Sequence, residues 1–114
     1  MFPLVFGPRR VTARRLVCVP RRFLREMQMG TPARVEFVAQ GDETVLLRTP
    51  LRGETDFPAA TISSVGQVVL PRPVLESLNL SSDRMLYMRP GRGLEGVTLM
   101  SPRQALGTGP LGGN

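Results

Sequence analysis

The sequence carries an internal repeat, in which residues 10–50 and 61–102 share one order of chemical characters at an offset of about 51 residues. In each copy an apolar stretch is followed by a proline, a basic residue, a short amphipathic stretch, a turn and two further apolar stretches. Corresponding residues are Thr12 and Ser63, Val17 and Val68, Pro20 and Pro71, Arg21 and Arg72, Leu24 and Leu75, and Val35 and Leu86. A unit of roughly 40 residues is too small to bury its own apolar face. The two copies are therefore expected to complete one another in a shared core.

The second copy has the clearer local signals. Residues 60–70 predict two short extended segments around a turn, and Pro71 ends the second segment because it cannot donate to a ladder. Val74, Leu75 and Leu78 then recur at helical spacing. Residues 84–89 and 96–100 follow as two strands of a hairpin.

The first copy repeats this order. It predicts an extended stretch over residues 11–19, a helix over 21–29, and strands over 34–38 and 44–48. The expected organisation is a first unit at 1–50, a linker at 51–59, a second unit at 60–102 and a flexible tail at 103–114. The predicted fold class is mainly β with short helices, in which two β-β-α-β-β units build one barrel.

Charge is unevenly divided between the two halves. The chain has no lysine, and residues 1–52 hold ten arginines and four acids, whereas residues 53–114 hold five of each. The whole net charge of +6 therefore lies on the first half. Such a concentration indicates one working face and an anionic partner, and arginine suits phosphate and guanine edges. A GC-rich genome would also explain the absence of lysine.

Several residue types that catalysis or metal binding needs are missing. There is no histidine, and the single cysteine, Cys18, lies between two valines, which predicts a small buried side chain in a strand. We therefore expect no enzyme activity, no metal site and no cofactor. Residues 1–6 are too short for a signal sequence and no stretch is long enough to span a membrane. Five methionines are expected in the core, namely Met27, Met29, Met85, Met88 and Met100.

The segment TISSVGQVVLPRPVLESLNLSSDRMLYMRP resembles the AbrB/SpoVT/MazE family of bacterial swapped-hairpin DNA-binding domains. The shared pattern is a glycine and a polar residue, three apolar residues, a proline and a short helix. It is formed here by Gly66, Gln67, Val68–Leu70, Pro71, Leu78 and Leu80. The resemblance implies a swapped-hairpin (cradle-loop) barrel in which two copies interlock, here within one chain as in the similar MraZ-type proteins. It also implies binding of promoter DNA.

Carried over onto matching positions, the family's basic residues fall mainly in the first unit. Arg9 and Arg10, ten to eleven residues before Pro20, match a basic pair of the family, and Arg25 matches a basic helix position. The predicted DNA-binding residues are Arg9, Arg10, Arg14, Arg15, Arg21, Arg22, Arg25, Gln67 and Arg72. The second unit has Leu75 and Glu76 where basic residues would stand, which favours one basic face supplied by the first unit. Arg21 and Arg72 occur in both repeats, so they also suit a structural role.

The predicted function is a DNA-binding transcriptional regulator in the cytoplasm, associated with the nucleoid and forming a homodimer or higher oligomer. The alternative is an antitoxin or another module that binds a partner protein and regulates its own expression. A third possibility, RNA binding, has less support because aromatic residues are few and tryptophan is absent.

Overall fold

A computed structural model describes residues 5–26, 32–49, 57–80, 84–90 and 96–106. These residues form eight strands and three short helices. In chain order the elements are β1 (Phe6–Arg10), β2 (Leu16–Cys18), α1 (Arg21–Glu26), β3 (Ala33–Gly41), β4 (Thr44–Arg48), β5 (Ala60–Ile62), β6 (Gln67–Val69), α2 (Arg72–Leu78), β7 (Met85–Pro90), β8 (Gly96–Met100) and α3 (Pro102–Leu106).

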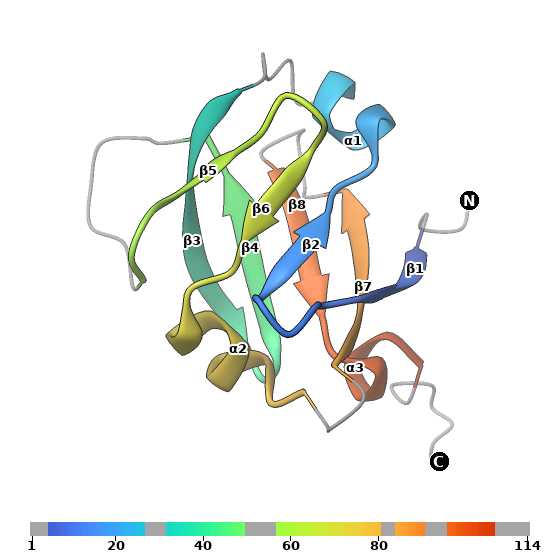
Figure 1. The fold of residues 1–114 in the computed structure, drawn as a ribbon. Coiled ribbons are helices and arrows are strands. Elements are labelled where there is room, and N and C mark those ends of the chain that lie inside the picture. The colour runs from blue at the N-terminus through green and yellow to red at the C-terminus, as the bar shows by residue number, and fades with distance from the viewer. Residues whose placement is uncertain (1–4, 27–31, 50–56, 81–83, 91–95, 107–114) are drawn as a thin grey trace.

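The strands form one eight-stranded sheet in the order β1-β7-β8-β4-β3-β5-β6-β2, which curls into a nearly closed barrel (Figure 1). The two edge strands, β1 and β2, are consecutive in the chain and are joined by a tight turn. In that turn the Thr12 N–H donates to the Leu16 carbonyl oxygen over 2.9 Å. The prediction of a mainly β barrel with short helices is confirmed.

Strand pairing crosses repeatedly between the two repeats. β1 pairs with β7, β2 with β6, β3 with β5 and β4 with β8, so four of the seven strand pairings join one repeat to the other. Within the described residues the first repeat keeps one pairing of its own, β3 with β4, and the second keeps two. The repeats are therefore interlocked rather than placed side by side.

The two repeats are related by an internal two-fold arrangement. Val17 pairs with its own counterpart Val68, and on the other side of the barrel Leu46 pairs with Thr98, which has the same place in β8 as Leu46 has in β4, at an offset of 52 residues. The turns repeat in detail, because Thr12 Oγ1 accepts from the N–H of Leu16 and Ser63 Oγ accepts from that of Gln67, both over 3.1 Å. The repeat seen in the sequence is thus a repeat of backbone geometry.

One hydrophobic core lies inside the barrel and draws on both repeats. Its largest fully buried side chains include Phe23 and Phe37 of the first repeat and Leu78, Leu86 and Met88 of the second. α2 contributes Val74 and Leu78, as its helical spacing predicts, while Asn79 ends the helix in a left-handed conformation. Met100 is also buried, as expected.

Three local predictions differ from the structure, and part of a fourth lies outside the described residues. Strand β1 (Phe6–Arg10) lies before the stretch that was expected to be extended. Cys18 is exposed rather than buried, because alternation along β2 turns Val17 inward and Cys18 outward. Helix α1 is described only to Glu26, and residues 27–29 of its predicted span lie outside the described residues. The predicted flexible tail begins instead with helix α3, which packs on β7 and β8.

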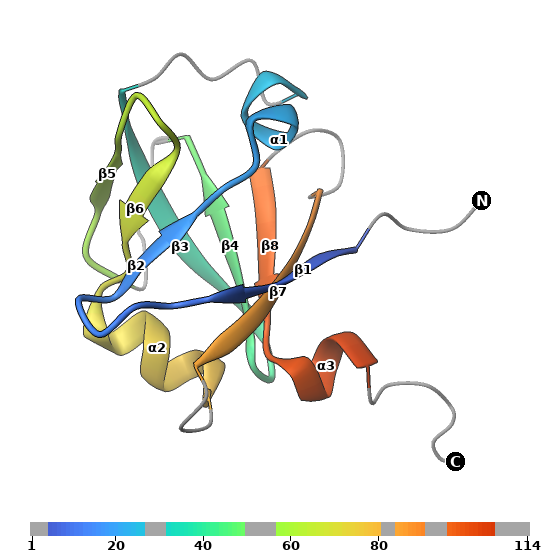
Figure 2. The same ribbon diagram turned by 45° about the vertical axis from the view of Figure 1, so that its right-hand side comes forward.

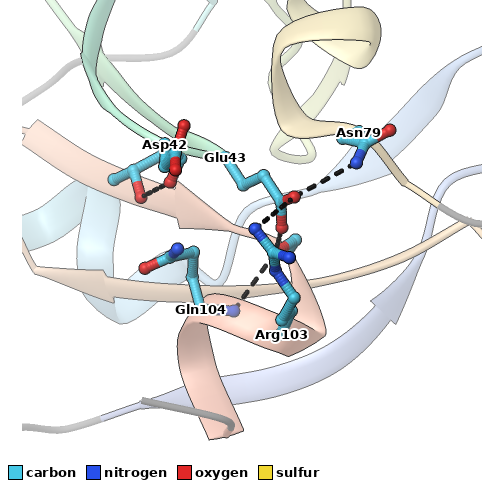
Figure 3. Close-up of polar contacts among 7 residues, drawn as sticks. Asp42, Glu43, Asn79, Arg103 and Gln104 are labelled. Carbon is cyan, nitrogen blue, oxygen red and sulfur yellow. Dashed lines mark hydrogen bonds and ion pairs between the residues drawn. The ribbon is translucent and has the colours of Figure 1, made fainter.

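A network of hydrogen bonds and an ion pair around one carboxylate joins three segments at the C-terminal end of α2 (Figure 3). Glu43, in the turn between β3 and β4, accepts hydrogen bonds from Ser101 Oγ over 2.5 Å and from Asn79 Nδ2 over 3.1 Å. Arg103 Nη2 lies 3.1 Å from the same carboxylate. These bonds, chiefly that of Ser101, hold the pKa of Glu43 below its ordinary value. One side chain thus links α2, the β3–β4 turn and α3.

The lowered pKa makes this network sensitive to acid. A carboxyl whose folded pKa lies below its unfolded pKa stabilises the fold above the unfolded value, and loses that effect as the pH falls through the folded value. We expect Glu43→Gln to lower the melting temperature at about pH 7, and the difference from wild type to narrow as the pH drops below about 4. Thermal unfolding followed by circular dichroism at several pH values measures this. A difference that stays constant with pH would show that the charge of Glu43 does not matter.

Candidate nucleic-acid interface

Strand β1 presents its two arginines differently. Arg9 is half-buried, with its guanidinium 4.6 Å from the centre of the Phe6 ring. Phe6 in turn meets the buried Phe23 edge to face, with ring centres 5.9 Å apart. Arg9 therefore stacks against the fold through a cation–π contact, whereas Arg10 is exposed.

The turn between β1 and β2 carries the next pair. Thr12 Oγ1 accepts from the N–H of Arg14 over 3.3 Å, and this tight turn leaves the Arg14 side chain exposed. Arg15 is half-buried and has a left-handed backbone with φ of 66°. Its Nε donates to the Leu70 carbonyl oxygen over 3.1 Å. Arg14 thus faces solvent, while Arg15 is held against the second repeat.

Helix α1 is amphipathic over its six residues. Phe23 and Leu24 are buried, and Arg21, Arg22 and Arg25 are all exposed. The Pro20 carbonyl oxygen accepts from the N–H groups of Phe23 and Leu24, so the first turn forms directly after β2. This helix therefore displays three guanidinium groups while its apolar side anchors it to the core.

Gln67 lies on the outside of the β2–β6 ribbon. It pairs with Cys18 and is exposed. Two apolar side chains near it are also exposed, Val65 at 56% and Val69 at 43%. Amide groups and apolar side chains both contact base edges in DNA complexes, the latter through the thymine methyl group.

The structure places six of the eight predicted arginines in two groups rather than on one continuous face, and the other two, Arg9 and Arg10, lie in β1. Because β2 and β6 run antiparallel, the helices that follow them, α1 and α2, lie at opposite ends of the barrel (Figure 2). Arg21, Arg22 and Arg25 lie at the α1 end. Arg14, Arg15 and Arg72 lie at the α2 end, where Leu70 donates its N–H to the Arg15 carbonyl oxygen.

The ion pairs of the described residues involve arginines other than the predicted DNA-binding ones. The ion pairs within the described residues join Arg48 to Glu36 over 2.8 Å and Arg103 to Glu43 over 3.1 Å. Neither involves any of the predicted DNA-binding arginines. Two of the four acids of the first half are therefore engaged with other arginines.

Sequence reasoning missed one residue of interest, Arg84. Its Nη1 donates to the Thr12 carbonyl oxygen over 3.3 Å, and it lines the same groove as Arg15 and Arg72. The repeat gave a signal for Arg84, because its counterpart in the first repeat is Ala33. In the same way, the counterpart of Arg15 in the second repeat is Gly66. Positions where only one copy is charged could have been selected on that basis.

No family model, curated protein or solved structure matches the chain. The resemblance to the AbrB/SpoVT/MazE family therefore remains a prediction from the quoted residues. In the part of the chain that the structure describes, the helices are all too short to cross a membrane.

Proposed function

We propose that the protein binds duplex DNA and regulates transcription. The observation that carries this proposal is a set of exposed arginines without carboxylate partners among the described residues. Its members are Arg10, Arg14, Arg21, Arg22 and Arg25. Unpaired guanidinium groups of this kind bind phosphates and release the counterions condensed on DNA.

The spacing of the two basic groups also suits a duplex. Arg14 and Arg21 stand seven residues apart at the two ends of β2, so at most about 25 Å of chain separates them. The major groove is about 12 Å wide, which allows the two groups to reach phosphates on either side of it. Gln67 lies on the ribbon between them and is the candidate for a base contact.

The dependence of DNA affinity on salt tests this proposal. We expect the double variant Arg21→Gln/Arg22→Gln to lower the slope of log affinity against log salt concentration by about two, because each lost phosphate contact removes roughly 0.9. Fluorescence anisotropy with a labelled duplex, at a series of salt concentrations, gives the slope.

The matched control is Arg34→Gln/Arg89→Gln, which removes the same charge from two exposed arginines that are not among the predicted DNA-binding residues and have no ion-pair partner among the described residues. We expect it to leave the slope unchanged. An equal fall in both double variants would mean that net charge alone attracts DNA, and no measurable binding by the wild type would reject the function itself.

A further inference from the structure

A groove of about 700 Å³ lies at the α2 end of the barrel and collects three arginines from three separate segments. Arg15 comes from the β1–β2 turn, Arg72 from the start of α2 and Arg84 from the residue before β7. Leu75 and Leu80 add apolar surface, and Glu76 adds a single carboxylate. The volume falls within the range of small-molecule sites, and the lining is net positive.

Two of these guanidinium groups are held in place by the backbone. Arg15 Nε donates to the Leu70 carbonyl oxygen, and Arg84 Nη1 donates to the Thr12 carbonyl oxygen. Each bond uses one of five N–H donors, so most donors of both side chains remain available to a ligand. Among the described residues none of the three arginines has an ion-pair partner. Fixed side chains lose less entropy when a ligand binds.

The same two arginines have unfavourable backbone conformations. Arg15 has φ of 66° and Arg84 has φ of 51°, both in the left-handed region. This region is unfavourable for a residue with a side chain, and such residues concentrate at functional sites. The second repeat has Gly66 in place of Arg15, with φ of 86°, where glycine adopts the conformation without that cost.

The opposite end of the barrel shows that the fold does not require this arrangement. There the counterparts of Arg15 and Arg84 are Gly66 and Ala33, so only the helix arginine, Arg21 for Arg72, is retained. Glycine would adopt the left-handed conformation of Arg15 more easily, so the presence of arginine at this position calls for an explanation other than the backbone. Ligand binding supplies one.

We propose that this groove binds a small phosphorylated molecule of nucleotide or sugar-phosphate size. The arginines bind the phosphate, since their planar donors match its oxygens. Leu75 and Leu80 face the base or ring, and Glu76 accepts a hydrogen bond from a hydroxyl group. Arg15 and Arg72 then serve the small ligand and not DNA, so this site is separate from the exposed arginines of the candidate interface.

Calorimetric titration of the intact protein with inorganic pyrophosphate tests the site. We expect saturable binding by the wild type and a loss of at least about tenfold in affinity in Arg15→Gly and in Arg72→Ala, because charged hydrogen bonds are lost. Arg15→Gly should keep the fold, since glycine is the residue of the equivalent turn. Its melting temperature measures this. Arg21 is the counterpart of Arg72 at the opposite end of the barrel. We expect Arg21→Ala to bind pyrophosphate with the affinity of the wild type.

The remaining outcomes also decide the question. Absence of saturable binding, or an equal loss in Arg21→Ala, overturns the proposal. A parallel titration with duplex DNA distinguishes the two possible ligands, a small phosphorylated molecule and the DNA backbone. If Arg15→Gly loses pyrophosphate binding but keeps DNA affinity, the groove is a small-ligand site. If it loses both and DNA displaces pyrophosphate, the groove holds the DNA backbone and the proposal is wrong.

Discussion

Replacing Gly96 by alanine is expected to destabilise the protein by about 3 kcal/mol or more, a large part of the 5–15 kcal/mol that holds a typical domain folded. A Cβ atom at this position would overlap the carbonyl oxygen of Leu47 and would also approach Arg48 Cβ at 3.0 Å. Leu47 lies in β4, which is paired on both sides, with β3 and with β8. The carbonyl therefore cannot move aside without breaking a ladder.

The effect is steric and does not come from the backbone preference of glycine, because Gly96 is not among the residues with positive φ. Thr44→Ala is the matched control, because Thr44 and Gly96 belong to the two end pairs of the same β4–β8 ladder. Thr44 pairs with Met100 at one end, and Gly96 pairs with Arg48 at the other. Thr44→Ala removes one exposed hydrogen bond and should cost no more than about 1.5 kcal/mol. Urea unfolding of both variants measures the two free energies. A cost below about 1 kcal/mol for Gly96→Ala would show that β4 and β8 separate easily.

Elements whose signals are local could be predicted from the sequence. The second strand of each hairpin, at residues 44–48 and 96–100, has the predicted bounds. Helix α2 also lies where Pro71 and the spacing of Val74 and Leu78 indicate. These elements are bounded by turn residues and contain contrasting apolar and polar positions, which is the information that a single sequence carries.

The candidate site was less predictable, because it depends on which ends of the barrel the helices occupy. Arg15 and Arg21 are six residues apart in the chain, yet the extended strand β2 between them leads to opposite ends. Arg84 is 69 residues from Arg15 and meets it at the groove through the pairing of β1 with β7. The Glu43 network likewise joins three distant segments, and no periodic pattern marks such contacts.

Comparison of the two repeats shows where function and fold separate. Several buried positions are apolar in both copies, as with Val17 and Val68 or Phe37 and Met88, although the buried Leu46 corresponds to the polar Thr98. Some charged positions differ, as Arg15 and Gly66 show, whereas Arg21 and Arg72 are charged in both copies. Packing constrains the buried positions equally in both copies, since any change of volume is felt in a dense core. Surface positions are under no such packing constraint, so the two copies can carry different charges there.

Neither repeat is expected to fold alone as a monomer. A fragment of residues 57–106 would lose the partners of all four of its strands in the first repeat, and would keep only the β5–β6 and β7–β8 pairings. Two-stranded hairpins are at best marginally stable in water, and half of the shared core would be exposed. Circular dichroism and sedimentation of this fragment measure folding and association together.

The interlocked topology also predicts what restores the fold. The fragment can pair with a second copy of itself, because Val68 already lies on the two-fold relation opposite its counterpart Val17. We therefore expect either an unfolded monomer or a folded homodimer, with folding that increases with concentration. Addition of residues 1–52 should favour a one-to-one complex, because only that pairing reproduces the native core, to which both repeats contribute side chains. A folded monomer that is independent of concentration would contradict the interlocking of the two repeats.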